Sequence, residues 1–153
     1  MIVTCKAVPR STLIAYQNHD EGARELADLA RAHDRVWVVA YDDPTTPVLG
    51  AGRHDLLVLD GGALAQDALA MRRAIEFILA AHADGPHATI THDLLVVACD
   101  RGIHRSGTIV TWAAEHLGLD VASLRLHNPQ IDPDPCLLRW LRFTHVSLKS
   151  GGT

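Results

Sequence analysis

The sequence lacks any excess of positive charge. Its 153 residues include 14 Lys and Arg against 18 Asp and Glu, which gives a formal net charge of -4 at pH 7. A protein that binds long nucleic acids neutralises many backbone phosphates with cationic side chains, and this chain has no surplus of them. We therefore do not expect nucleic acid as a general partner, although a local basic site is compatible with this balance.

Long apolar runs are absent as well. The longest, such as Leu94 to Ala98, are far short of the roughly 20 residues that span a bilayer. Met1 to Ala15 contains no apolar segment followed by a small-residue cleavage site, as a secretory leader would. The three cysteines are far apart, without a Cys-x-x-Cys pair, so they do not form the disulfide framework of a small secreted domain. These absences predict a cytoplasmic protein with no membrane partner.

The composition is that of one ordinary folded domain. Apolar residues make up 48% of the chain and charged residues 21%, and the length suffices for a core without disulfides or metal. We predict a single domain over residues 1–153. The ten histidines include no pair at His-x-x-x-His spacing, so we predict neither a metal site nor a cofactor.

Short β-rich runs alternate along the chain with longer segments of helical period. The predicted strands are Ile2 to Cys5, Val36 to Tyr41, Leu56 to Leu59 and Leu94 to Ala98. The predicted helices are Gly22 to His33, Leu64 to about Gly85, Gly107 to Leu117 and a last one after Pro135. Because Leu94 to Ala98 is unbroken aliphatic sequence, it suits a central strand buried on both faces. The pattern predicts an α/β fold with a mostly parallel central sheet and helices on both faces.

The most informative stretch is Leu94 to Thr108, with the sequence LLVVACDRGIHRSGT. It predicts a buried strand, a tight loop and the start of a helix. Such a loop directs successive backbone N–H groups and the positive end of the helix dipole into one concavity, which suits an anion. The predicted phosphate-binding residues are Asp100, Arg101, Gly102, Ile103, His104 and Arg105.

Three side chains in this stretch suggest chemistry. At the edge of an anion site the pKa of Cys99 should fall below about 8.5, which makes a thiolate nucleophile available at neutral pH. Arg105 can hold two phosphate oxygens with its planar guanidinium. Ser106 is placed to donate a hydrogen bond to the sulfur when it leaves again, and Gly102 allows the sharp turn.

Residues Cys99 to Thr108 resemble the signature loop of the cysteine-dependent tyrosine and dual-specificity protein phosphatases, in which Cys-x5-Arg is followed by Ser or Thr. Ala74 to Ile78 resembles the helix before the signature strand in the compact dual-specificity enzymes. The opening IVTCKAVPRS, the chain length and the helix entry at Pro133 to Pro135 resemble a group of small bacterial tyrosine-phosphatase-like proteins. Two positions depart from the pattern: Ala98 replaces the usual histidine, and Asp100 adds a carboxylate to the loop.

The resemblance implies a tyrosine-phosphatase-like fold and metal-independent hydrolysis of a phosphomonoester through a phospho-cysteine intermediate. The substrate would be a phosphorylated protein side chain, phosphotyrosine or another, or a small phosphorylated molecule. In the family an aspartic acid some 30 to 40 residues before the cysteine protonates the leaving oxygen. Asp60 stands at the matching position, and Asp42 and Asp43 are the alternatives. Because of the two departures we expect weak activity.

Two other classes of function compete with this one. A non-catalytic phosphate- or RNA-binding regulatory domain would fit Ala98 and the run His104-Arg105-Ser106, which is similar to the loop of an RNA-regulatory adaptor family. That loop has a second glycine where this chain has Arg101. Sulfur transfer and arsenate reduction fit less well, because sulfurtransferase loops are one residue shorter and the arsenate reductase loop follows the first strand.

Overall fold

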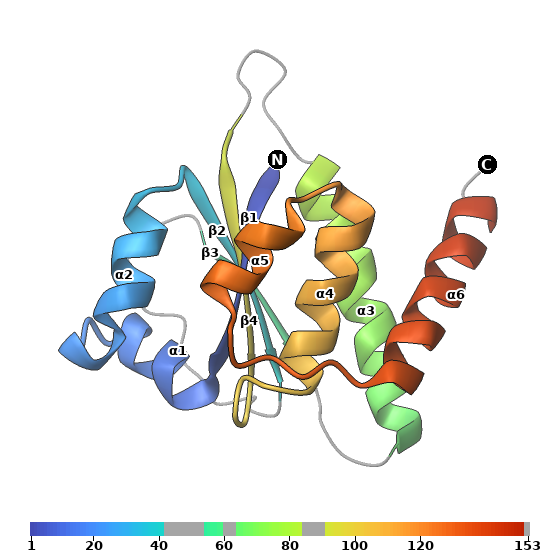
Figure 1. Cartoon of the computed structure of the whole chain (residues 1–153), viewed down its shortest axis with the longest axis horizontal. Helices are drawn as coiled ribbons and strands as arrows, with labels where there is room; N and C mark the ends of the chain where they lie inside the picture. The colour runs from blue at the N-terminus through green and yellow to red at the C-terminus, as the bar shows by residue number, and fades with distance from the viewer. Residues whose placement is uncertain (42–53, 60–63, 84–90, 152–153) are drawn as a thin grey trace.

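The computed structural model describes residues 1–41, 54–59, 64–83 and 91–151 (Figure 1). Its elements follow in the order β1 (Ile2–Pro9), α1 (Arg10–Gln17), the 3-10 helix η1 (Glu21–Ala23), α2 (Arg24–Arg31), β2 (Arg35–Tyr41), β3 (His54–Leu59), α3 (Leu64–Ala83), β4 (Asp93–Cys99), α4 (Arg105–Leu117), α5 (Val121–His127) and α6 (Pro135–Gly151).

The four strands form one sheet in the order β1-β4-β2-β3, and every pair is parallel. β4 lies between β1 and β2 and is buried along its whole length, as its aliphatic sequence predicts. Because the strands are parallel, their carboxyl ends meet at one edge of the sheet, where Cys99 lies in register with Pro9. The end of the fully buried strand β4 therefore lies at the edge where α/β proteins commonly bind ligands.

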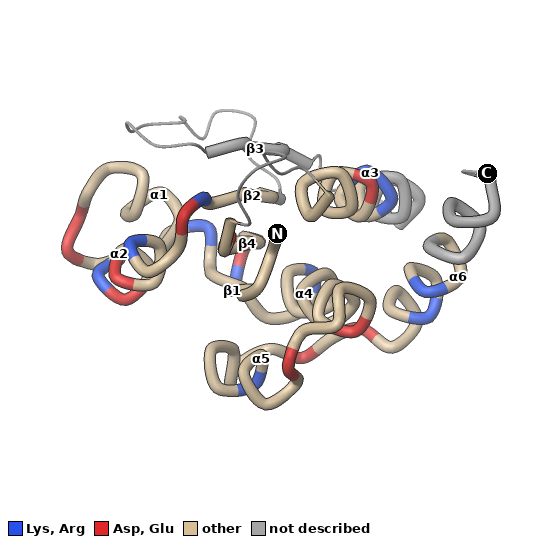
Figure 2. Tube along the Cα trace, turned by 90° about the horizontal axis from the view of Figure 1, so that it is seen from above, with Lys and Arg blue, Asp and Glu red and all other residues tan. Residues whose placement is uncertain are grey.

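Helices cover both faces of the sheet. Figure 2 shows α1 and α2 on one side of the strands and α3, α4 and α6 on the other. Leu13 of α1 and Leu26 of α2 pack with Leu94 and Val96 of β4 in one core cluster. A larger cluster on the opposite face joins the sheet to α3, α4, α5 and α6, and it includes Met71, Ile75, Leu95, Val97, Trp112, Leu124 and Leu141. The predicted α/β class, with a parallel sheet and helices on both faces, is confirmed.

Several boundaries differ from the sequence prediction. β1 continues past Cys5 to Pro9, because an edge strand tolerates polar Lys6, whose ammonium binds the His127 carbonyl, and a proline at its end. α1 and α5 were not predicted. α1 buries only Leu13 and Gln17, and α5 buries only Leu124, so neither has an apolar stripe wide enough to give a helical period.

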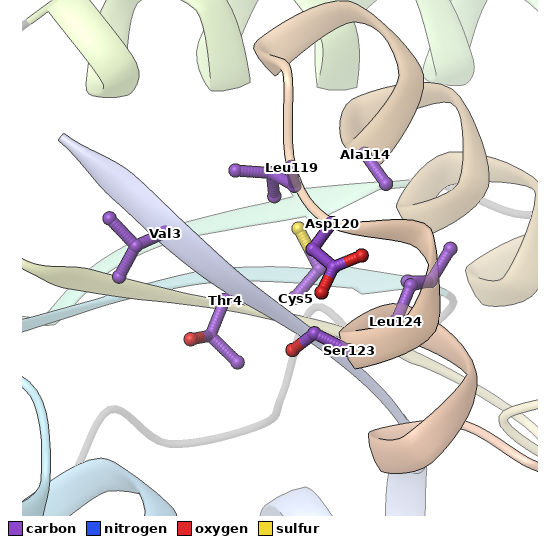
Figure 3. Close-up of a pocket in the computed structure, with 8 residues that line it drawn as sticks. All are labelled: Val3, Thr4, Cys5, Ala114, Leu119, Asp120, Ser123 and Leu124. Carbon is purple, nitrogen blue, oxygen red and sulfur yellow. The ribbon is translucent and has the colours of Figure 1, made fainter.

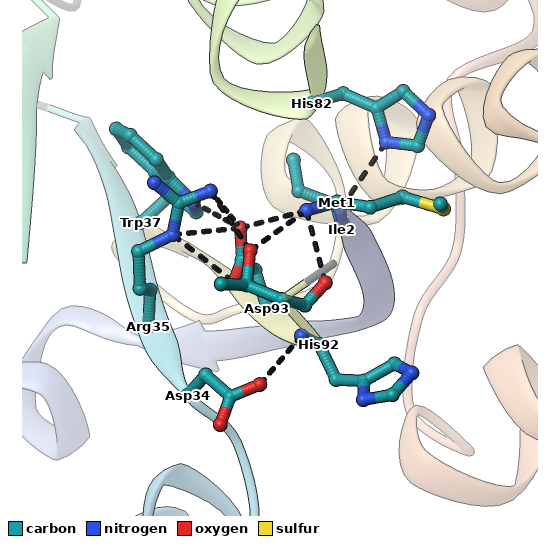
Figure 4. A network of polar contacts seen from close by, with 9 residues as sticks. Met1, Ile2, Asp34, Arg35, Trp37, His82, His92 and Asp93 are labelled. Carbon is teal, nitrogen blue, oxygen red and sulfur yellow. Dashed lines mark hydrogen bonds and ion pairs between the residues drawn. The ribbon is translucent and has the colours of Figure 1, made fainter. Parts of the chain in front are cut away.

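The amino end of β4 is held by a buried ion pair (Figure 4). Asp93, which is fully buried, accepts hydrogen bonds from Arg35 Nη2 at 2.8 Å and from Trp37 Nε1 at 3.0 Å, both on β2. The amino group of Met1 lies 3.1 Å from the same carboxylate. Burial raises the pKa of Asp93, but the hydrogen bonds outweigh it and hold the pKa at about 2. The ion pair therefore ties β4 to β2 at the end of the sheet opposite Cys99.

Within the described part of the chain, no helix is both long enough and apolar enough to cross a membrane.

Candidate functional site

The loop between β4 and α4 brings the predicted cysteine and serine together. Cys99 is the last residue of β4 and is only 4% exposed, and Ser106 is fully buried in the first turn of α4. The Cys99 Sγ and the Ser106 Oγ are hydrogen-bonded at 3.1 Å. Arg105, also predicted for the site, is the half-buried first residue of α4. A short loop thus closes the gap from strand to helix around the sulfur.

The surroundings of Cys99 favour its thiolate. Burial raises the pKa of the thiol, but hydrogen bonds from the Ser106 hydroxyl and from the backbone N–H groups of Ser106, Gly102 and Ile103 outweigh it. The net result is a pKa below the ordinary cysteine value. Because these backbone groups are hydrogen-bond donors, the same cradle can stabilise an anion bound beside the sulfur.

Gly102 cannot carry a side chain at this place. Its φ is +70°, in the left-handed region that other residues rarely adopt. A Cβ there would lie 2.5 Å from the Pro9 nitrogen and 2.8 Å from the Val8 oxygen. The loop therefore turns directly against the backbone at the end of β1, and the glycine of the signature sequence is required by packing as well as by the turn.

The start of α4 leaves its helix dipole free to act on the site. The N-cap residue His104 makes no side-chain cap hydrogen bond, and the first turn contains no acidic residue. The positive end of α4 is therefore not neutralised from within the helix. Of the other predicted phosphate-binding residues, Asp100, Arg101 and His104 are exposed on the loop and Ile103 is half-buried.

Ala98, which stands where the phosphatases that the loop resembles have a histidine, is fully buried. It lies in register with Val8 on one side and Ala40 on the other, and packs in the cluster beneath α1 and α2. The lowered pKa of Cys99 arises here from Ser106 and backbone donors rather than from a residue at this position. The proposed acid Asp60 and its alternatives Asp42 and Asp43 lie outside the described residues.

A segment at residues 130–132, which the sequence did not predict as part of the site, contacts the loop between β4 and α4 from outside. The Asp132 N–H donates to the Ile103 carbonyl at 3.0 Å, and Gln130 Nε2 donates to the Gly102 carbonyl at 3.3 Å. A Cβ at Gly107 would lie 2.9 Å from the Cβ of Ile131, so α4 and this segment pack closely. The segment lies more than twenty residues after the loop, and its run of prolines and aspartates indicated only a connection.

A small pocket, partly open to solvent, lies elsewhere, between β1 and α5 (Figure 3). Its lining includes Cys5, Asp120 and Ser123, and none of the signature-loop residues. Burial raises the pKa of Cys5 to about 12, so this thiol stays protonated and unreactive. Among the described residues, no group of three His, Cys, Asp or Glu side chains is placed to hold a metal ion.

No protein-family model and no curated protein matches the sequence. Among solved structures, PTPMT1 in complex with PI(5)P is similar at 14% identity and a TM-score of 0.47, over 98% of this chain and 95% of that one. A leucine rich repeat and phosphatase domain containing protein from Entamoeba histolytica is similar at 14% identity and a TM-score of 0.49, over 87% of each chain. Human DUSP28 is similar at 19% identity and a TM-score of 0.46, over 82% of this chain and 84% of that one. At such identities a similarity concerns the fold alone, and chemistry has to be argued from Cys99 and its surroundings.

Proposed function

We propose that the protein hydrolyses a phosphomonoester through a phospho-cysteine intermediate, with no metal ion taking part. The observation that carries the proposal is the position of the Cys99 sulfur. It lies at the base of a loop in which the backbone N–H groups of Gly102, Ile103 and Ser106 are hydrogen-bonded to it, and it is also hydrogen-bonded to the Ser106 hydroxyl, so that its pKa is lowered. A thiol whose pKa is lowered inside an anion-binding cradle is a suitable nucleophile for transfer of a phosphoryl group.

In the first step the Cys99 thiolate attacks phosphorus, and the bond from phosphorus to the leaving oxygen breaks. The loop N–H groups, the dipole of α4 and the Arg105 guanidinium stabilise the charge on the three equatorial oxygens. Asp60 gives its proton to the leaving oxygen, so that an alcohol or phenol departs. The loop, the helix dipole and Arg105 thus stabilise the negative charge that a metal ion stabilises in metal-dependent phosphatases, and Asp60 supplies the proton for the leaving group.

In the second step water attacks phosphorus and the bond between sulfur and phosphorus breaks. The carboxylate of Asp60 accepts a proton from that water, and inorganic phosphate is released. The Ser106 oxygen lies 3.1 Å from the Cys99 sulfur, and once the sulfur departs as a thiolate the Ser106 hydroxyl can donate a hydrogen bond to it, which makes sulfur a better leaving group. The substrate is a phosphorylated protein side chain or a small phosphorylated molecule.

The purified protein should hydrolyse para-nitrophenyl phosphate between about pH 5 and 7 in excess EDTA. Cys99→Ser should lower the rate at least roughly a thousandfold, because a hydroxyl of high pKa cannot replace a thiolate. Cys136→Ser is the matched control, since it removes an exposed cysteine on α6 and should leave the rate unchanged. Activity that survives in Cys99→Ser, or that disappears with the chelator, contradicts the mechanism.

A second measurement separates catalysis from binding alone. Inorganic phosphate should slow the alkylation of Cys99 by iodoacetamide if the loop holds an anion against the sulfur. If phosphate protects Cys99 in this way while no phosphomonoester is hydrolysed, the loop binds phosphate without chemistry. The protein would then be a phosphate-binding regulatory domain.

A further inference from the structure

Side-chain amides from the segment after α5 complete the outer edge of β1. Asn128 Oδ1 accepts the Ala7 N–H at 2.7 Å, and Asn128 Nδ2 donates to the Cys5 carbonyl at 2.9 Å. Gln130 Nε2 donates to the Ala7 carbonyl at 3.1 Å. An edge strand presents a row of backbone groups without a neighbouring strand, and these two amides satisfy part of that row.

Gln130 differs from Asn128 because it also reaches the signature loop. The same Nε2 that donates to Ala7 lies 3.3 Å from the Gly102 carbonyl. The Gly102 carbonyl belongs to the same planar trans peptide as the Ile103 N–H, so the two groups point in opposite directions. When Gln130 holds the carbonyl outward, the N–H is directed inward, toward the Cys99 sulfur that it contacts.

The next peptide is held in the same way. The Asp132 N–H donates to the Ile103 carbonyl at 3.0 Å, which directs the His104 N–H to the inner side of the loop. Asp132 uses its backbone for this bond, whereas Gln130 uses its side chain. Substitution at position 130 can therefore remove one anchor while the other remains.

We infer that Gln130 is a positioning residue for Cys99, which fixes the Gly102–Ile103 peptide so that its N–H points at the sulfur. The loop needs such an anchor from outside because it turns at a glycine in the left-handed region, and glycine is the residue with the widest range of backbone conformations. Gly102 has no side chain with which to fix itself, and its neighbours Asp100 and Arg101 are exposed. Gln130 links the turn to β1, a strand of the rigid sheet.

The test is the pH dependence of Cys99 alkylation by iodoacetamide in the full-length Gln130→Met variant. Methionine has nearly the shape of glutamine and no charge, so it removes the donor without adding an electrostatic effect of its own. Gln130 is an exposed residue, and the variant should fold. We expect the midpoint of the Cys99 profile to rise by about half a pH unit, so that alkylation below the midpoint is about threefold slower. The exposed Cys136 reacts in the same sample, and its profile, resolved by peptide mass, should be unchanged.

Asn128→Ala is the matched control, because Asn128 caps the same strand edge without a bond to the loop. It should lower the melting temperature more than Gln130→Met, since Asn128 is buried, and should leave the Cys99 midpoint in place. An unchanged midpoint in Gln130→Met overturns the inference, and so does an equal shift in both variants.

The inference rests on the proposed function only for the importance of Cys99. Because alkylation needs no turnover, a shifted midpoint in a protein without phosphatase activity would refute the function and leave the role of Gln130 standing.

Discussion

Arg105 is the residue in the loop whose shape matters as much as its charge. A guanidinium presents two parallel N–H donors to two oxygens of a phosphate, whereas an ammonium acts as a point charge. Arg105 begins α4 directly before Ser106, at the end of the helix that adjoins the loop. Substitution of Arg105 by lysine keeps the charge and removes the planar guanidinium. It therefore tests whether Arg105 binds phosphate or only begins the helix.

We expect Arg105→Lys to lower kcat/KM by at least about tenfold, which corresponds to about 1.4 kcal/mol of transition-state stabilisation. Both binding and turnover should suffer, because the two-pronged contact holds oxygens that carry charge in the transition state. Steady-state kinetics with para-nitrophenyl phosphate measures the effect. A value within about twofold of wild type would mean that Arg105 serves the helix start and nothing more.

Part of the site can be predicted from sequence because its residues are close along the chain. Cys99, Arg105 and Ser106 belong to one strand, loop and helix start, so spacing alone brings them together. Gln130 could not be predicted, since its contact with Gly102 depends on how the chain returns past β1. The proton donor stays a prediction for the same reason: a carboxylate on a different loop has a role only through three-dimensional placement.

At the scale of elements, the signature loop packs directly against the backbone at the end of β1. Gly102→Ala should destabilise the protein by about 2 kcal/mol or more, because the new methyl group meets the backbone at Val8 and Pro9 in addition to the strain of a positive φ. The loop should also move, so that Cys99 becomes less reactive toward iodoacetamide below its pKa. Urea unfolding and alkylation rates measure the two effects.

Gly118→Ala provides the control for this prediction. Gly118 ends α4 with a φ of +72°, nearly that of Gly102, but a Cβ there meets no atom within 4 Å. Gly118→Ala should therefore lower the free energy of unfolding only through backbone strain, by about 1 kcal/mol. Equal losses for the two variants would show that the contact with β1 contributes nothing.

The elements themselves were predicted unevenly, for a physical reason. β4 and α4 have strong signals, because an aliphatic run marks a strand buried on both faces and Gly118 ends the helix in the left-handed conformation. α1 and α5 each lie on the sheet through one or two buried side chains, such as Leu13 and Leu124. A helix held by so few contacts leaves almost no pattern in the sequence.

At the scale of the whole molecule, the ion pair between Asp93 and Arg35 links stability to pH. The pKa of Asp93 is held at about 2 in the folded protein, against about 3.9 for an unfolded chain. The folded state therefore favours the carboxylate. Its contribution is fully present above about pH 4 and is lost as the pH falls toward 2, where Asp93 becomes protonated in both states.

We expect urea unfolding of the wild type to lose about 2 kcal/mol of stability over this range through Asp93. Asp93→Asn should cost about 3 to 5 kcal/mol at pH 7, because Arg35 is left buried beside a neutral group, and should flatten the acid dependence below pH 4. Asp28→Asn is the control, since Asp28 pairs with Arg31 on the exposed side of α2, and its effect should stay under about 1 kcal/mol. An acid profile of Asp93→Asn that parallels the wild type would contradict this assignment.

The register of β1 against β4 also decides what happens to Cys99 under oxidation. Cys5 pairs with Leu95 whereas Cys99 pairs with Pro9, so the two cysteines are separated by four residues along adjacent strands, on the order of 13 Å. A disulfide needs Cα atoms within about 7 Å, which excludes a bond between them in the folded protein. Peroxide attacks the thiolate, which the lowered pKa of Cys99 favours. The resulting sulfenic acid finds no resolving thiol on β1. Reduction of the sulfenic acid then depends on Cys136 or on a small thiol such as glutathione. In the absence of both, oxidation of Cys99 proceeds to the irreversible sulfinic acid.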